Sequence, residues 1–181
     1  GKVAVVLKTH LAGDIVDDTT LTADTVWELD GLVAVKNGAV LTIEPGTTIV
    51  GQPGTGANTS YLVIDKGCKI MADGTADEPI IFTSKTAYEG GEEAPGQWGG
   101  LTVIGNAADV GVPNGQEQVK PYEVNTDFVP GSVAADDDSG VLRYVEILNS
   151  GITMEQDKEI NGLSLVGVGS GTTVENVTVK R

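Results

Sequence analysis

The stretch "VLTIEPGTTIVG", residues 40–51, is echoed 21 residues later by "YLVIDKGCKIMA", residues 61–72. The two stretches keep apolar residues and a glycine at the same places: Leu41 with Leu62, Ile43 with Ile64, Gly46 with Gly67 and Ile49 with Ile70. Alternating apolar residues on both sides of a glycine are typical of two short strands joined by a tight bend. Self-similarity at roughly this interval indicates a repeat architecture in which each repeat forms one coil.

The length of the repeat fits one coil of a three-sided solenoid. At about 3.3 Å per residue, such a repeat traces about 70 Å, and strands of successive coils lie about 4.8 Å apart. The pattern therefore predicts that Leu41 stacks on Leu62 and Ile43 on Ile64. A leucine-rich repeat is not supported, because its Leu-x-x-Leu-x-Leu frame is absent. The expected fold is all-β, a right-handed parallel β-helix of about four coils.

Further strand-like stretches follow the echo, and they are "PIIFTS" (79–84), "GLTVIGN" (100–106), "VLRYVEILNSG" (141–151), "GLSLVGVGSG" (162–171) and "TTVENVTVK" (172–180). A long inserted loop is expected around 106–140, where prolines and acidic residues interrupt the pattern. Residues 1–26 are expected to form an N-terminal cap or lead-in. Residues 27–181 are expected to form the β-helix domain, which we expect to continue beyond 181 in a parent protein.

The charge balance limits the class of partner. The chain carries 26 acidic and 11 basic residues, a formal net charge of −15. Nucleic acid and anionic membrane surfaces are disfavoured, because both require basic side chains. No apolar run is long enough to span a membrane. A single cysteine, Cys68, excludes an internal disulfide bond.

Five phrases carry a resemblance to a known family, and they are "LDGLVAVKNGAVLTIEPGTTIVG", "ADGTADEPIIFTS", "GQWGGLTVIGNA", "DDDSGVLRYVEILNSG" and "EINGLSLVGVGSGTTVENVTV". In this order, from about residue 27 to the end, they resemble bacterial exported or cell-surface proteins built as right-handed parallel β-helices. The resemblance implies an extracellular or bacterial cell-surface location. It consists of turn and core motifs and brings no catalytic signature.

The acidic run Asp136, Asp137 and Asp138 is the candidate metal site. Calcium prefers several oxygen ligands from a flexible loop, and this run offers three carboxylates. The spacing of an EF-hand loop is absent, so a solvated acidic turn is the alternative interpretation. Calcium is the one cofactor that the sequence suggests.

Aromatic residues in the inserted segments are the candidate ligand contacts. Trp98, Tyr88 and Tyr122 could stack on sugar rings, because an aromatic face suits the apolar face of a sugar. Trp98 precedes a strand, so packing at a corner of the coil is the alternative role.

Catalytic chemistry has less support. A polysaccharide lyase needs a base, and Arg143 in "LRYVEI" is the arginine within a strand, where a solvated position is the alternative. A glycosidase needs two carboxylates, and Glu44 and Asp65 are predicted to lie one above the other. Cys68 is predicted to fill the slot that Thr47 fills in the preceding coil. We assign no catalytic residue.

The sequence therefore predicts an extracellular structural or adhesive β-helix protein that is not an enzyme. If the last coil is open, we expect the protein to self-associate end to end into a filament or matrix. Cell-surface or matrix components and glycans are the other expected partners. The alternative function is carbohydrate binding or polysaccharide degradation by a calcium-dependent lyase or a glycosidase.

Overall fold

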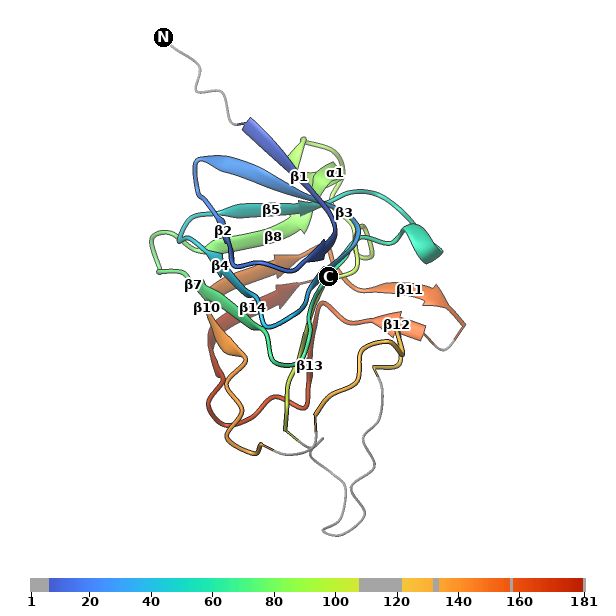
Figure 1. The fold of residues 1–181 in the computed structure, drawn as a ribbon. Helices are drawn as coiled ribbons and strands as arrows, with labels where there is room; N and C mark the ends of the chain where they lie inside the picture. The colour runs from blue at the N-terminus through green and yellow to red at the C-terminus, as the bar shows by residue number, and fades with distance from the viewer. Residues whose placement is uncertain (1–6, 108–121, 132–133, 157, 181) are drawn as a thin grey trace.

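The computed structural model describes residues 7–107, 122–131, 134–156 and 158–180, which wind into a β-solenoid (Figure 1). Helix is confined, among these residues, to α1 (Lys85–Tyr88) and the 3-10 turn η1 (Gly56–Asn58). The strands are β1 (Leu7–Ile15), β2 (Thr19–Leu21), β3 (Thr25–Val35), β4 (Val40–Ile43), β5 (Thr48–Gly51), β6 (Tyr61–Ile64), β7 (Lys69–Asp73), β8 (Ile80–Ser84), β9 (Leu101–Ile104), β10 (Gly140–Leu148), β11 (Ile152–Glu155), β12 (Lys158–Ile160), β13 (Leu163–Val166) and β14 (Thr173–Lys180).

Parallel pairing arranges the strands into three faces. Sheet 1 contains β2, β4, β7 and the first halves of β10 and β14. Sheet 2 contains the first halves of β1 and β3, then β5, β8 and the second halves of β10 and β14. Sheet 3 contains the second halves of β1 and β3, then β6, β9 and β13. The predicted all-β, parallel β-helix fold is confirmed.

Four long strands turn a corner without ending, and β1 does so at Gly13 (φ 73°). β3 bends at Gly31 (φ 69°), β10 at Tyr144 (φ 47°) and β14 at Asn176 (φ 51°). One residue in the left-handed region redirects an extended chain, and glycine adopts that region without steric cost. A single strand can therefore serve two faces of the solenoid.

The predicted register of the echo is wrong. Leu41 of β4 pairs with Ile70 of β7, and Leu62 of β6 pairs with Val33 of β3. Leu41 thus lies in sheet 1 and Leu62 in sheet 3, although both side chains are buried in the same core. The pairing interval at these positions is 29 residues (70 − 41 and 62 − 33).

The core consists of apolar columns that run along the solenoid axis. Ile43, Ala72 and Leu142 occupy successive rungs of sheet 1 and are at most 1 % exposed. Equivalent columns on the other faces are Ile49–Phe82–Ile147 and Val33–Leu62–Leu101. Burying such side chains contributes about 1.5–3 kcal/mol each, before the cost of ordering the chain.

Excursions from the coils pack on the outer faces of sheets 2 and 3. Over sheet 2, Lys85 of α1 pairs with Glu28, which is only 6 % exposed. Over sheet 3, Tyr122 and Phe128 form a second apolar cluster with Tyr61 and neighbouring strand residues. Part of the predicted insertion, residues 108–121 and 132–133, lies outside the described residues.

Two segments add to the solenoid at its margins. β1 and β2, within the expected lead-in of residues 1–26, pair in parallel with β3 and β4 and so already form rungs. β11 and β12 form an antiparallel hairpin between β10 and β13 (Figure 1). None of the described helices is long and apolar enough to cross a membrane.

Candidate functional site

The outer face of sheet 1 carries a row of half-buried side chains. Thr42, Met71, Val141 and Thr173 occupy successive rungs of β4, β7, β10 and β14. Their alternation with the buried core positions follows from the two-residue period of a strand. The row forms a narrow, weakly polar stripe, with ionic groups along both sides of it.

An ionic ladder borders this stripe where sheet 1 turns toward sheet 2. Arg143 of β10 donates from Nη1 to Oδ1 of Asp73 at 2.8 Å and from Nε to Oε2 of Glu175 at 3.0 Å. The hydrogen bonds to Glu175 and Asp73 raise the pKa of the Arg143 guanidinium above its ordinary value. Arg143 is therefore a fixed cation with two acidic neighbours, which is unsuited to removing a proton from a substrate.

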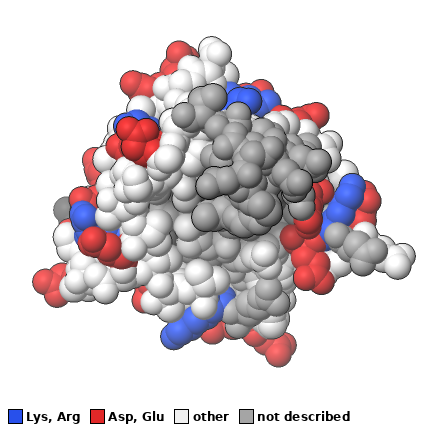
Figure 2. Space-filling view, turned by 90° about the horizontal axis from the view of Figure 1, so that it is seen from below, with Lys and Arg blue, Asp and Glu red and all other residues white. Residues whose placement is uncertain are grey.

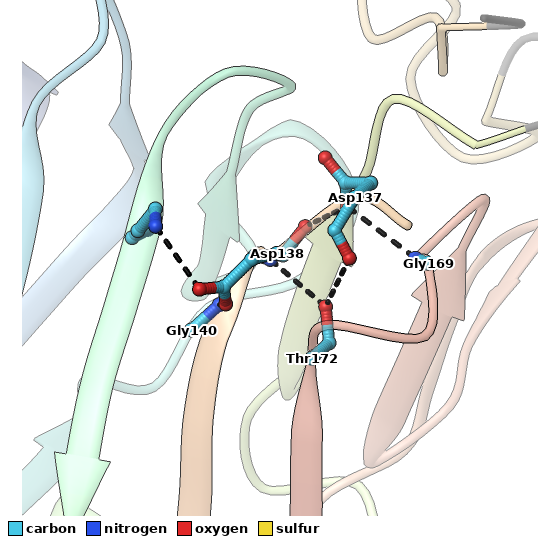
Figure 3. A network of polar contacts seen from close by, with 7 residues as sticks. Asp137, Asp138, Gly140, Gly169 and Thr172 are labelled. Atoms are coloured by element: carbon cyan, nitrogen blue, oxygen red, sulfur yellow. Dashed lines mark hydrogen bonds and ion pairs between the residues drawn. The ribbon is translucent and has the colours of Figure 1, made fainter. Parts of the chain in front are cut away.

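Asp137 and Asp138, two of the three predicted metal residues, lie in a polar network that joins two loops (Figure 3). Oδ2 of Asp137 accepts a hydrogen bond from Ser139 Oγ at 2.7 Å and from the backbone N–H of Gly169 at 3.4 Å. The backbone carbonyl of Asp137 accepts from Gly171 N–H at 3.1 Å and from Thr172 Oγ1 at 3.4 Å. Asp137 therefore ties the loop before β10 to the loop before β14.

Asp138 points away from Asp137 toward sheet 1. Its Oδ2 lies 3.1 Å from Lys69 Nζ, and its Oδ1 accepts a hydrogen bond from Gly140 N–H at 2.9 Å. The hydrogen bond from Lys69, followed by that from Gly140, lowers the pKa of Asp138. Asp136 is exposed. Within the described residues, no group of three or more acidic, histidine or cysteine side chains is arranged to hold a metal ion.

The predicted ligand residues have three different environments. Trp98 is 1 % exposed and stacks on Phe82, with ring centroids 6.1 Å apart, so its ring has no free face for a sugar. Tyr122 is 6 % exposed and its hydroxyl lies 3.0 Å from Thr102 Oγ1. Burial raises the pKa of Tyr122. Tyr88 in α1 is exposed at 42 %. The structure does not bring the three together in one site.

Two other predicted pairings are wrong because they depended on the incorrect register. Glu44 follows β4 in sheet 1 and Asp65 follows β6 in sheet 3, so the prediction that they stack is wrong. Cys68 lies directly before β7, as Ala39 lies directly before β4, and these two strands are paired. The Lys69 N–H donates to the Ala39 carbonyl. Cys68 therefore fills the slot of Ala39 and not that of Thr47. Its thiol is buried, and desolvation raises its pKa.

A groove runs beside the ionic ladder, at the corner between sheets 1 and 2. It has a volume of about 500 Å³, and its lining residues are Ala76, Pro79, Tyr144, Glu146, Asn176, Val177 and Thr178. Tyr144 and Asn176 are the corner residues of β10 and β14, and both have positive φ. Sequence reasoning missed this groove, because an unusual φ at a tyrosine leaves no pattern in the sequence.

The surface carries charge of both signs around its margin. In the view from below, acidic side chains lie along the edge, several of them beside lysine or arginine (Figure 2). Among the described residues, five lysine and arginine side chains form ion pairs with carboxylates, and they are Lys36, Lys69, Lys85, Arg143 and Lys158. With a formal net charge of −15, the surface as a whole repels anions.

Comparison with known proteins gives one positive finding. The model of a protein family described as a pectate-lyase like beta helix domain matches residues 13–181. No curated protein and no solved structure gives a significant match.

Proposed function

Because the chain belongs to the pectate-lyase-like β-helix family, we propose that it is a polysaccharide-binding β-helix module with a structural or adhesive role. The family description connects the fold with enzymes that act on polysaccharides. The solenoid supplies a stiff scaffold, and the outer face of sheet 1 with its corner groove supplies the surface for a linear polymer.

One observation carries the non-catalytic part of this proposal, namely the pairing of Arg143 with both Asp73 and Glu175. Elimination from a uronate requires a base that removes the proton next to the carboxyl group. Arg143 is placed on the outer face of the sheet, but its two ion pairs hold it protonated. These contacts support a role in stiffening the surface.

The location proposed for the module is the cell exterior or the bacterial cell surface. Support comes from the strongly acidic composition and the excess of short strands over helix, which suit a stable, soluble rod in a salty medium. Secretion of the natural protein by its producing cell, detected with an antibody in medium and cell fractions, would test the location.

Binding and cleavage are separated by two measurements on the same protein. Affinity electrophoresis in gels that contain xyloglucan, glucomannan or polygalacturonate is expected to show retardation by at least one neutral polymer. Incubation with polygalacturonate, in calcium-containing and calcium-free buffer, is expected to give no rise in the ultraviolet absorbance of unsaturated products. Release of such products, lost in Arg143→Lys, would establish the degradative alternative and overturn the proposal.

A second candidate function, end-to-end self-association, rests on the side chains of the last described coil. Leu165, Val174 and Val179 continue the inward columns but are 41 %, 40 % and 44 % exposed. A coil from another copy would cover them and pair with the edge of β14 that has no partner strand among the described residues. Sedimentation velocity over a concentration series is expected to show larger species that Val179→Asp abolishes, whereas a monomer at every concentration would remove this candidate.

A further inference from the structure

The corner groove has the shape of a small-ligand site. Its walls are the turn that contains Ala76 and Pro79 and the middle of β10 and β14, where these strands change from sheet 1 to sheet 2. A volume of about 500 Å³ lies within the range of roughly 300–1,000 Å³ that is usual for ligand pockets.

Tyr144 occupies a backbone position that favours glycine. Its φ is 47°, which is an outlier for a bulky aromatic residue. Gly74, which follows β7 in the neighbouring coil, lies beside Tyr144. A Cβ added at Gly74 would lie 2.7 Å from the Tyr144 carbonyl oxygen. Strained residues of this kind are common where the side chain is used for binding. A tyrosine at this corner therefore points to a use of its ring.

The groove combines one aromatic ring with three polar side chains. Tyr144 can contact the apolar face of a sugar, as aromatic rings do in many recognition sites. Glu146 accepts hydrogen bonds, Asn176 both donates and accepts them, and Thr178 does the same through its hydroxyl. We infer that this groove binds a neutral sugar residue of the polysaccharide, an inference that rests on the proposed function.

The acidic side chains at the groove favour a neutral sugar over a negatively charged uronate. Glu146 is the acidic residue that lines the groove, and Asp73 and Glu175 lie at the adjoining edge of sheet 1. Arg143, the cation nearest to them in the ladder, is already matched by these two carboxylates. A uronate carboxylate would therefore meet uncompensated negative charge, whereas sugar hydroxyls can donate to Glu146.

The test is calorimetric titration of the whole chain with cellohexaose, mannohexaose and hexagalacturonate. One of the two neutral oligosaccharides is expected to bind, and hexagalacturonate is expected to bind at least about tenfold more weakly. Tyr144→Gly is expected to weaken neutral binding about tenfold or more without lowering the thermal midpoint, because glycine accepts the positive φ. Tyr144→Phe keeps the ring and is expected to retain binding, and Glu146→Gln is expected to weaken it several-fold.

Met71→Asp probes the stripe on the outer face of sheet 1. Thr153→Ala is the matched control, because Thr153 is exposed in β11, outside both sheet 1 and the groove lining. It is expected to leave oligosaccharide affinity unchanged within about twofold. If Tyr144→Gly binds like the natural chain while Met71→Asp does not, the sugar lies on the stripe and the groove inference fails while the proposed function stands. Preference for hexagalacturonate also overturns the inference. If no polymer or oligosaccharide is bound at all, the proposed function itself fails.

Discussion

Trp98 fills the space that a side chain at Gly51 would need. A Cβ placed on Gly51 would lie 2.6 Å from the Cβ of Trp98. The indole ring stacks on Phe82 with an interplanar angle of 6°, and its Nε1 donates to the Leu148 carbonyl at 2.7 Å. Because Gly51 has no side chain, the indole of Trp98 fits against β5. This contact anchors the excursion of residues 85–98 to the core.

This relationship predicts that Gly51→Ala destabilises the fold. The extra methyl group must displace the indole, and overpacking of a core costs about 1–3 kcal/mol. Urea denaturation would measure the change in the free energy of unfolding. The penalty is expected to shrink in a Trp98→Gly background, which removes both the Cβ and the indole that the new methyl group would meet. An equal penalty in both backgrounds would show that the ring does not cause it.

The pairing of Asp138 with Lys69 predicts a pH-dependent contribution to stability. The folded state lowers the pKa of Asp138, so the contribution is present above the unfolded value of about 3.9 and is lost as the pH falls through the lower folded value. Because both side chains are well exposed, the contribution is expected to be a few tenths of a kcal/mol. Asp138→Asn is therefore expected to be slightly less stable than the natural chain at about pH 6, with the difference gone near about pH 2.

Urea denaturation at both pH values would measure this difference. Asp136→Asn is the control, since Asp136 is an exposed neighbour in the same acidic run. A difference for Asp138→Asn that stays constant with pH would show that the lost hydrogen bonds, and not the charge, account for it.

The environment of Cys68 predicts an unreactive thiol. It is 2 % exposed, and burial raises its pKa, so little thiolate forms at neutral pH. Reaction with iodoacetamide, followed by mass spectrometry, is expected only under unfolding conditions. A Cys68→Ala, Thr42→Cys protein places the thiol on the outer face of sheet 1 and is expected to react at once. Rapid labelling of native Cys68 would contradict the described burial.

Calcium binding at Asp136–Asp138 stays a prediction, and the polar network makes it a demanding one. An ion would have to replace Ser139 at Asp137 and Lys69 at Asp138. We therefore expect weak binding, with a dissociation constant of about 1 mM or higher. Calorimetric titration with calcium chloride would measure it, and Asp137→Asn is expected to abolish it. Micromolar affinity, or a fall of the thermal midpoint with a chelator, would show a site stronger than this geometry allows.

The sequence predicted the class of fold but not its register, and the reason is geometrical. Two different corners of the solenoid consist of a strand, a tight turn and a second strand with the same apolar alternation. The quoted echo therefore matches β4–β5, a corner from sheet 1 to sheet 2, with β6–β7, a corner from sheet 3 to sheet 1. The true partner of "VIDKGCKI" (63–70) is "AVKNGAVL" (34–41), which gives the 29-residue interval.

Candidate site residues were harder to predict than core residues. Trp98 and Tyr122 lie in excursions, where aromatic side chains suit either a ligand or a second packing layer, and only the path of the chain decides. Asp137 offered the ligands of a metal site, but its partners Gly169 and Thr172 are distant in sequence. Tyr144 reads as an ordinary strand residue, and its positive φ depends on where β10 turns.

Paired strands of this solenoid stay in step although the chain between them varies greatly in length. Thr19 pairs with Leu41 after 22 residues, Val40 with Lys69 after 29, and Ile70 with Gly140 after 70. Rungs are therefore defined by geometry and not by contour length, so corners are natural places to graft peptides or whole domains. The excursion of residues 85–98 could be lengthened without changing any contact in the apolar columns of the core. A longer excursion is expected to slow folding, because its ends are farther apart along the chain.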